Sequence, residues 1–357
     1  MKNLPDQIFS GHWNGGHVQG IAIDPLRGYV YFSFTTMLIK TDLNGKLIGS
    51  VKNLTGHLGC ITFDDARNRV YGSLEYKHDV IGRGIMNKTG QALADEDAFY
   101  AVEFHCDAIT RPDMDAESDG VMRAVYLGNV VRDYKERDEV SSKEHRYGCS
   151  GIDGIGLGPV FGSAPDSPKK LMIAYGIYSD TERQDNDYQV ILQYGPSIFD
   201  TYGKPLCQLQ PHHSGPKSCE KRYFLYTGNT SWGIQNLEYD AYTDNWIVAV
   251  YTGKKEQFSN QPLFLIDGRI PPRLTPLRGR NGEVGAELSL ATLGACDQNG
   301  IYGIQFPYGQ TGVCAMGNGI YYFSHPKKHE DGSYSSTVVR YGIDTTAPSV
   351  FFEELSK

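Results

Sequence analysis

The sequence predicts an all-β protein, a five-bladed β-propeller with long loop insertions between its strands. Three observations lead to this prediction. Glycine accounts for 41 and tyrosine for 24 of the 357 residues, which is typical of aromatic strands joined by Gly-rich turns. Short apolar runs alternate with period two, and helical spacing is nearly absent. A two-strand unit also recurs five times, as expected for radial β repetition.

Each unit begins with a short polar or aromatic cluster, then Gly-Ile or a similar step and an apolar strand that often ends in Asp. A turn and a second strand rich in Tyr follow. The paired strands fall at 17–24 with 29–34, 57–64 with 69–74, 151–156 with 171–175, 233–240 with 245–251, and 302–306 with 319–324. The five units predict five blades, with His17 and His57 at the same repeat position on adjacent blades.

Further apolar strands flank every unit and bring each blade to four strands. Those before the units lie at 7–10, 46–49, 122–126, 223–226 and 288–291, and those after them at 38–42, 98–103, 189–194, 263–267 and 337–341. Because propeller rings are commonly closed by the first strand, residues 7–10 are expected to complete the unit that ends near Tyr341.

The remaining segments are charged and Gly-rich and carry little helical periodicity. We expect surface loops at 78–97, 107–120, 133–146, 200–220 and 268–286. Since the five units close one ring, residues 1–357 are expected to form a single domain.

Composition also limits the partners. Lys and Arg number 34 and Asp and Glu 42, so the net charge is 34 − 42 = −8, which argues against nucleic acid as the main partner. No apolar run reaches the roughly 20 residues that span a bilayer, and the first residues lack the apolar core of a signal peptide. A cytoplasmic protein is expected, or a secreted one whose leader has been removed. The sequence does not indicate an oligomeric state.

The repeat resembles the NHL, gluconolactonase-like and YWTD propeller repeats. The residues that carry the resemblance are 20–24 (Gly-Ile-Ala-Ile-Asp), 29–31 (Tyr-Val-Tyr) and 41–45 (Thr-Asp-Leu-Asn-Gly). The resemblance implies the propeller fold and no particular function. Five-bladed glycosidases typically carry an Asp nucleophile at the start of the first inner strand, where this chain has His17, Val18 and Gln19.

Propeller geometry brings one part of every blade to the same face. The first strand of each blade lines the central channel, and its start lies beside the end of the second strand. The side chains expected at this mouth are polar or aromatic: His17, Gln19, Thr35, His57, Glu75, Asp153, Tyr178, Trp232, Gln235, Tyr251, Tyr302, Gln305 and His325.

Two imidazoles at one repeat position suggest a metal site. His17 and His57 would point into the channel from adjacent blades, with Asp153, Gln19 or Gln305 as oxygen ligands for a divalent ion such as Ca, Mn or Zn. The alternative is that both histidines cap the channel through hydrogen bonds.

Proton transfer and ligand binding have their own candidates. Glu75 and His325 end their second strands and could act as general acid and base, whereas Glu75 could instead pair with Lys77 or Arg83 at the surface. The aromatic candidates Tyr178, Trp232, Tyr251 and Tyr302 could stack on a sugar ring or pack between blades, and the amides of Gln19, Gln235 and Gln305 would complete the substrate-binding set.

Seven scattered cysteines do not indicate a disulfide framework. Cys60 and Cys314 are expected to be buried in their strands. The cluster formed by Cys207, His212, His213 and Cys219 could hold zinc, form a disulfide or keep free thiols, and the spacing alone leaves all three open.

Taken together, the residues favour a hydrolase or lyase that acts on a small sugar-derived or lactone-like substrate in the central funnel, with or without help from a metal ion. The alternative is a non-catalytic propeller that binds a glycan, another ligand or a protein. Ionisable groups gathered at the rim favour the enzyme, and whether the protein is catalytic at all stays open at this point.

Overall fold

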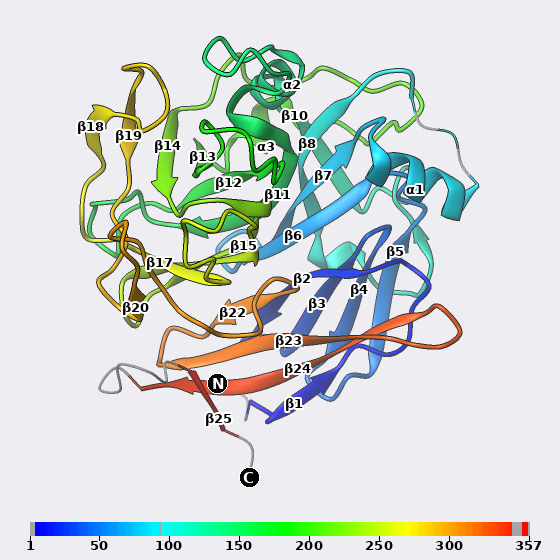
Figure 1. The fold of residues 1–357 in the computed structure, drawn as a ribbon. Helices are drawn as coiled ribbons and strands as arrows, with labels where there is room; N and C mark the ends of the chain where they lie inside the picture. The colour runs from blue at the N-terminus through cyan, green and yellow to red at the C-terminus, as the bar shows by residue number, and fades with distance from the viewer. Residues whose placement is uncertain (1–3, 91, 93, 345–351, 356–357) are drawn as a thin grey trace.

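The computed structural model describes residues 4–90, 92, 94–344 and 352–355. Five sheets stand in a ring around a central axis (Figure 1), which confirms the five-bladed β-propeller. The blades follow each other along the chain, and the innermost strands are β2, β6, β11, β15 and β22.

The first two blades have regular four-stranded cores. Blade 1 contains β2 (Val18–Asp24), β3 (Tyr29–Phe34), β4 (Met37–Asp42) and β5 (Leu47–Lys52), and the short β9 (Met114–Asp115) extends it. Blade 2 contains β6 (His57–Asp64), β7 (Arg69–Tyr76), β8 (Ala98–His105) and β10 (Met122–Tyr126).

The other blades depart from four strands. Blade 3 contains β11 (Cys149–Gly158), β12 (Lys170–Ile177), β13 (Tyr188–Tyr194) and β14 (Lys221–Tyr226), followed by β19 (Val284–Glu287) and β18 (Arg273–Pro276). Blade 4 has β15 (Thr230–Asp240), β16 (Asn245–Thr252) and β17 (Leu263–Asp267). Blade 5 has β22 (Val313–Ala315), β23 (Ile320–Lys328), β24 (Tyr334–Ile343), β1 (Gln7–Phe9) and β25 (Phe352–Glu354).

The N-terminal strand closes the ring. β1 pairs antiparallel with β24, with Ile8 opposite Val338, and the buried Ile8 packs in the cluster that joins blades 5 and 1. This pairing of the two ends of the chain confirms the predicted closure by residues 7–10.

The fifth unit was assigned wrongly in its first strand. Residues 302–306 do not form the inner strand of blade 5, because β21 (Tyr302–Gly303) pairs with β20 (Ala295–Cys296) in a separate two-stranded sheet. The inner strand is β22, inside the segment expected to be a Gly-rich turn. Gly312 precedes it where an added Cβ would lie 2.9 Å from the Ile21 backbone nitrogen, so close packing at the axis requires a glycine there.

The segment predicted as an outer strand, 288–291, lies beside β17 but forms only an isolated bridge. It contacts β17 through a single bridge between Leu290 and Ile266. In the described part of blade 4, the sheet therefore has three strands.

Several segments expected to be loops contain regular structure. Residues 78–97 hold helix α1 (Val80–Thr89), which Asp79 caps at its start and Gly90 in a left-handed conformation caps at its end, whereas positions 91 and 93 lie outside the described residues. Segment 107–120 supplies β9, and 268–286 supplies β18 and β19. Helices α2 (Gly128–Lys135) and α3 (Ile198–Tyr202) overlap the starts of 133–146 and 200–220. Short 3₁₀ turns occur at Cys106–Ala108 and Arg146–Gly148.

The repeat residues have identifiable structural roles. Asp24 and Asp64 end their inner strands, and each accepts two backbone N–H bonds from the following turn. Ser33 and Ser73, on the second strands of blades 1 and 2, donate to the carbonyls of Gly59 and Asp153 on the next blade. These bonds join the second strand of one blade to the inner strand of the next.

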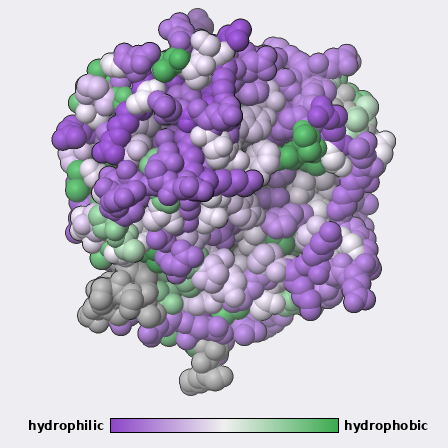
Figure 2. All heavy atoms as spheres, viewed as in Figure 1, coloured by the Kyte–Doolittle hydropathy of each residue, from purple (hydrophilic) through white to green (hydrophobic). Residues whose placement is uncertain are grey.

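The outer surface carries no large apolar face in the view of Figure 2, where hydrophilic residues dominate and apolar groups appear as separate spots. Within the described residues, no helix is long and apolar enough to span a membrane.

Candidate functional site

A pocket of about 300 Å³ lies at one mouth of the channel. Blades 1–4 and helix α1 line it, with the side chains of His17, Gln19, Thr35, His57, Ile81, Asp153, Trp232, Gln235 and Tyr251. Eight of these nine residues are ones that the sequence places at the mouth. Ile81 is the exception, because it comes from the helix that the sequence did not predict.

β-Bulges orient the side chains that line the pocket. The inner strands β2, β6, β11 and β15 all lose register with their second strands near their starts, between Val18 and Gly20, Leu58 and Ile61, Ile152 and Ile155, and Ser231 and Ile234. A bulge turns a strand locally and redirects its side chains. The irregularity therefore recurs where Gln19, Asp153 and Gln235 enter the pocket.

A buried ion pair forms the base of one wall. Lys77 Nζ lies 2.6 Å from Glu75 Oε1 and donates a 2.7 Å hydrogen bond to the Ser150 carbonyl. The other Glu75 oxygen accepts the Ile152 N–H at 3.1 Å. Burial opposes the charge on Lys77, but Glu75 and Asp79 outweigh it and raise the pKa of Lys77. The expected pairing of Glu75 with Lys77 thus exists, in the interior and not at the surface.

His57 is held as a neutral imidazole. Its Nδ1 faces two carboxyl groups, 3.5 Å from Glu75 Oε1 and 3.7 Å from Asp153 Oδ1, and forms no hydrogen bond with protein. Burial, together with the charge of Lys77, lowers the pKa of His57 to about 3. Burial is the larger cause of this neutrality, and the Lys77 ammonium adds to it because it offsets the charge of Glu75 beside the imidazole.

Asp153 carries the opposite perturbation. Burial and the neighbouring Glu75 raise the pKa of Asp153 well above its ordinary value, although Lys77 and a 3.1 Å hydrogen bond from Gln235 Nε2 oppose the shift. The side chain remains 13% exposed toward the pocket. A neutral imidazole therefore stands beside a carboxyl group whose pKa is raised.

The predicted metal ligands meet in this pocket but do not fit a metal ion. Within the described residues, no three or more His, Cys, Asp or Glu side chains are placed to hold one. The Lys77 ammonium occupies the position of a cation beside Glu75, and Gln235 occupies one oxygen of Asp153. His17 lines the pocket with its ring 5.9 Å from that of Tyr334. One oxygen of Asp153 is thus held by a protein group, whereas His57 Nδ1 has no hydrogen-bond partner among the described residues.

The rim of the pocket is aromatic and amide-rich. Trp232 is 37% exposed and adopts a φ of 66°, a left-handed conformation that is strained for a bulky residue. Its carbonyl accepts a 3.1 Å bond from Gln235, and the Tyr178 ring contacts it edge-on at 5.8 Å. Gln19 donates to Thr35 Oγ1 at 3.2 Å. This geometry holds a flat indole and two amides at the entrance.

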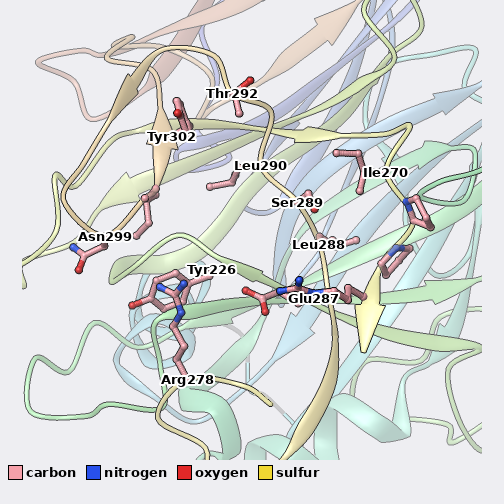
Figure 3. Close-up of a pocket in the computed structure, with 15 residues that line it drawn as sticks. Tyr226, Ile270, Arg278, Glu287, Leu288, Ser289, Leu290, Thr292, Asn299 and Tyr302 are labelled. Carbon is pink, nitrogen blue, oxygen red and sulfur yellow. The ribbon is translucent and has the colours of Figure 1, made fainter. Parts of the chain in front are cut away.

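Five predicted site residues do not line the pocket: the buried Glu75, described above, and Tyr178, Tyr302, Gln305 and His325. Tyr178 stands behind Trp232 and donates to Asp79 at 3.2 Å. His325 stacks on Tyr308 with ring centroids 3.6 Å apart and contacts the Tyr341 hydroxyl at 3.0 Å, so it packs in an aromatic cluster of blade 5. Tyr302 and Gln305 lie away from the pocket because residues 302–306 do not form the inner strand of blade 5. Gln305 is exposed, and Tyr302 lines a separate cavity of about 680 Å³ beside β18 and β19 (Figure 3).

The cysteine and histidine cluster does not assemble. All seven cysteines are free, with Cys60 and Cys314 buried as predicted. Cys207 is exposed and Cys219 half-buried, while His213 pairs with Glu96 at 2.9 Å and the His212 ring lies against Tyr100. Of the three alternatives for this loop, the structure shows free thiols.

Sequence reasoning missed the functional position of Lys77, Asp79 and Ile81. Lys77 lies two residues after Glu75, which places both side chains on one side of an extended chain. The signal for α1 was Asp79 with an apolar pair behind it, but Gly82 and Gly84 weakened the helical pattern.

No protein-family model and no curated protein sequence matches the chain. Three solved structures resemble it remotely. A calcium structure of a Trichoderma reesei carbohydrate-active enzyme of family AA12 is 10% identical, with a TM-score of 0.41 and coverage of 89% of this chain and 80% of the other. The holo PQQ domain of pyranose dehydrogenase from Coprinopsis cinerea is 10% identical, with a TM-score of 0.42 and coverage of 90% of this chain and 82% of the other. A Bacteroides caccae protein of unknown function is 9% identical, with a TM-score of 0.38 and coverage of 96% of this chain and 83% of the other. Likenesses this distant assign no activity.

Proposed function

We propose that the protein is an acid–base enzyme, a hydrolase or lyase, that acts on a sugar-derived or lactone-like substrate in the pocket at the channel mouth. The observation that carries the proposal is the pairing of a neutral imidazole, His57, with a raised-pKa carboxyl, Asp153, 3.7 Å apart. A neutral imidazole can accept a proton and a carboxyl group with a raised pKa can supply one, and general acid–base catalysis combines these two roles.

The roles follow from the protonation states. His57 takes a proton from water or from the substrate, and Asp153 gives its proton to the leaving oxygen. Because Nδ1 faces the carboxyl groups, Nε2 is the ring nitrogen left for the substrate. Glu75 touches Nδ1 and is only 2% exposed, so it acts as a positioning residue. Its separation of 3.5 Å from Nδ1 is at the limit for a hydrogen bond, which is common before a substrate tightens the site.

The substrate class follows from the rim. An exposed indole, the Tyr251 side chain and the amides of Gln19 and Gln235 suit a polyhydroxylated ring, which offers an apolar face and hydroxyl groups. The pocket of about 300 Å³ is at the lower end of the size expected for small-ligand sites.

A panel of sugar lactones, glycosides and uronates tests the proposal. On any substrate found, His57→Gln and Asp153→Asn should each lower kcat by roughly 10²–10⁴, whereas His105→Gln, an outer histidine that contacts Glu103, should retain parental kcat. Turnover that survives both pocket substitutions would refute the assignment.

A non-catalytic binding propeller is the second candidate. The aromatic and amide rim favours it equally, since these residues bind a ring without chemistry. Sugar binding by the parent and by His57→Gln with equal affinity, and without turnover by either, would establish this alternative.

A further inference from the structure

A second hollow lies near the pocket. It measures about 420 Å³ and lies over blade 1, where His12, Trp13, Gly15, Thr36 and Thr89 line part of it. Lys52 and Asp113 also line it and form an ion pair at 3.8 Å. Gly15 and Thr36 are neighbours, in sequence, of residues that line the pocket. Backbone bonds from Thr35 to His17 and from Thr36 to Gly15, 3.0 and 2.9 Å long, run side by side beneath both hollows.

Helix α1 forms a common wall. Ile81, in its first turn, lines the pocket, and Thr89, its last residue, lines the second hollow. Ten helical residues extend about 15 Å. The pocket and the second hollow therefore form one path along α1, which we call the α1 groove, and it is longer than a single sugar ring needs.

The outer half of the α1 groove offers an aromatic platform. Trp13 lines it, and a 2.6 Å hydrogen bond from Trp13 Nε1 to the Ser10 carbonyl fixes the indole. Backbone bonds of 2.9 Å in both directions attach Trp13 to Tyr334 on β24. The groove thus has one exposed-edge indole at each end, Trp232 at the pocket and Trp13 outside it.

Two ammonium groups lie near Tyr334, whose backbone pairs with Trp13. Lys88 Nζ from α1 and Lys328 Nζ from β23 lie 5.6 and 5.9 Å from the centre of the Tyr334 ring, and that centre is 5.9 Å from the centre of the His17 ring in the pocket. Neither lysine forms an ion pair within the described residues. The rings of His12 and His329 lie nearby, tilted by 36° with centroids 4.2 Å apart, and the Asp331 carboxylate accepts hydrogen bonds from Ser333.

This local positive charge contrasts with the net charge of −8 for the chain. Two cations that share one ring repel each other and lack a carboxylate from the protein, so an anionic group on a ligand would relieve the repulsion. The groove favours sugar rings, and the lysines favour carboxylates.

We propose that the α1 groove binds an acidic oligosaccharide, a chain of uronate residues, with one residue in the pocket and the next ones toward Trp13 and the lysines. This inference rests on the proposed function for the reacting residue, and binding along the groove can be measured without turnover. It narrows the substrate class from a small sugar to an oligomer with carboxylates.

Calorimetric binding tests the proposal with galacturonate, tetragalacturonate and the neutral cellotetraose. Tetragalacturonate should bind at least tenfold more tightly than either of the others, and the preference should weaken with added salt. Lys88→Ala with Lys328→Ala, and separately Trp13→Ala, should remove most of that preference and leave galacturonate binding unchanged. The matched control replaces two exposed lysines outside the groove, Lys135→Ala with Lys217→Ala.

Equal affinity for galacturonate and tetragalacturonate, or full binding by the lysine variant, would overturn the inference. If galacturonate alone binds and is turned over, the groove proposal fails and the proposed function stands. If tetragalacturonate binds through the lysines but no His57-dependent turnover is found with any probe, the groove proposal stands and the proposed function fails.

Discussion

Replacing Lys77 by methionine should cost about 3–5 kcal/mol of unfolding free energy, the usual loss when one member of a buried ion pair is removed. Lys77 is buried and makes a 2.6 Å contact with Glu75 and a 2.7 Å bond to Ser150. Without the ammonium, the buried Glu75 carboxylate keeps only the Ile152 N–H. This loss of unfolding free energy should be several times larger than the loss caused by an ordinary surface substitution.

The loss should depend on pH in a defined direction. Burial raises the pKa of Glu75 in the folded protein, and removal of Lys77 raises it further. A group whose folded pKa is raised contributes stability below its unfolded pKa, and that stability is lost as pH rises through the folded pKa. Lys77→Met should therefore be less destabilising near pH 5 than near pH 8.

Equilibrium urea unfolding at both pH values measures these quantities. The double variant Glu75→Gln with Lys77→Met should recover at least half of the loss, because both buried charges are absent, and Lys135→Met should stay within about 0.5 kcal/mol of the parent as the exposed control. A loss below about 1 kcal/mol for Lys77→Met, or a loss that is larger at pH 5, would refute the buried pair.

Three further predictions concern the acid, the rim and the closure. Since the pKa of Asp153 is raised, kcat/KM should fall on the alkaline side as Asp153 loses its proton, and a profile in Asp153→Asn that keeps this limb would contradict the acid role. Trp232→Ala should weaken sugar binding about 2- to 10-fold in calorimetry through loss of stacking, with Tyr242→Ala, an exposed aromatic outside the pocket, as the control that should bind like the parent. Ile8→Ala should destabilise by about 2–5 kcal/mol in urea because β1 holds the ring closed, and a loss no larger than that of the exposed Phe9→Ala would contradict this role.

The sequence predicts the parts of the fold that repeat. Strands β2, β6, β11 and β15 follow the Gly-Ile pattern, and the channel geometry then places their polar starts together. The inner strand of blade 5 was assigned wrongly because residues 302–306 match the repeat pattern. The true inner strand, β22, has only three residues and lies among glycines. Tyr302 and Gln305 were misplaced for that reason.

The electrostatics of the site could not be predicted from spacing. Glu75 and Lys77 are neighbours in any extended chain, and only the assembly of blades 2 and 3 buries them against Ser150 and Ile152. That burial creates an ion pair beside the neutral His57, which the spacing of the residues does not indicate. His325 was placed by strand position alone, and the aromatic cluster around Tyr308 turns it into a packing residue.

The protonation state of His57 tests the central claim most directly. Histidine ring signals followed by NMR between about pH 4 and 8, with His57→Gln to assign the signal, report it without any substrate. The account predicts that His57 stays neutral over this whole range, in keeping with its pKa of about 3. A titration near the ordinary histidine value of about 6.5 would show an imidazolium held by Glu75 and Asp153, and would contradict the neutral base on which the proposed function rests.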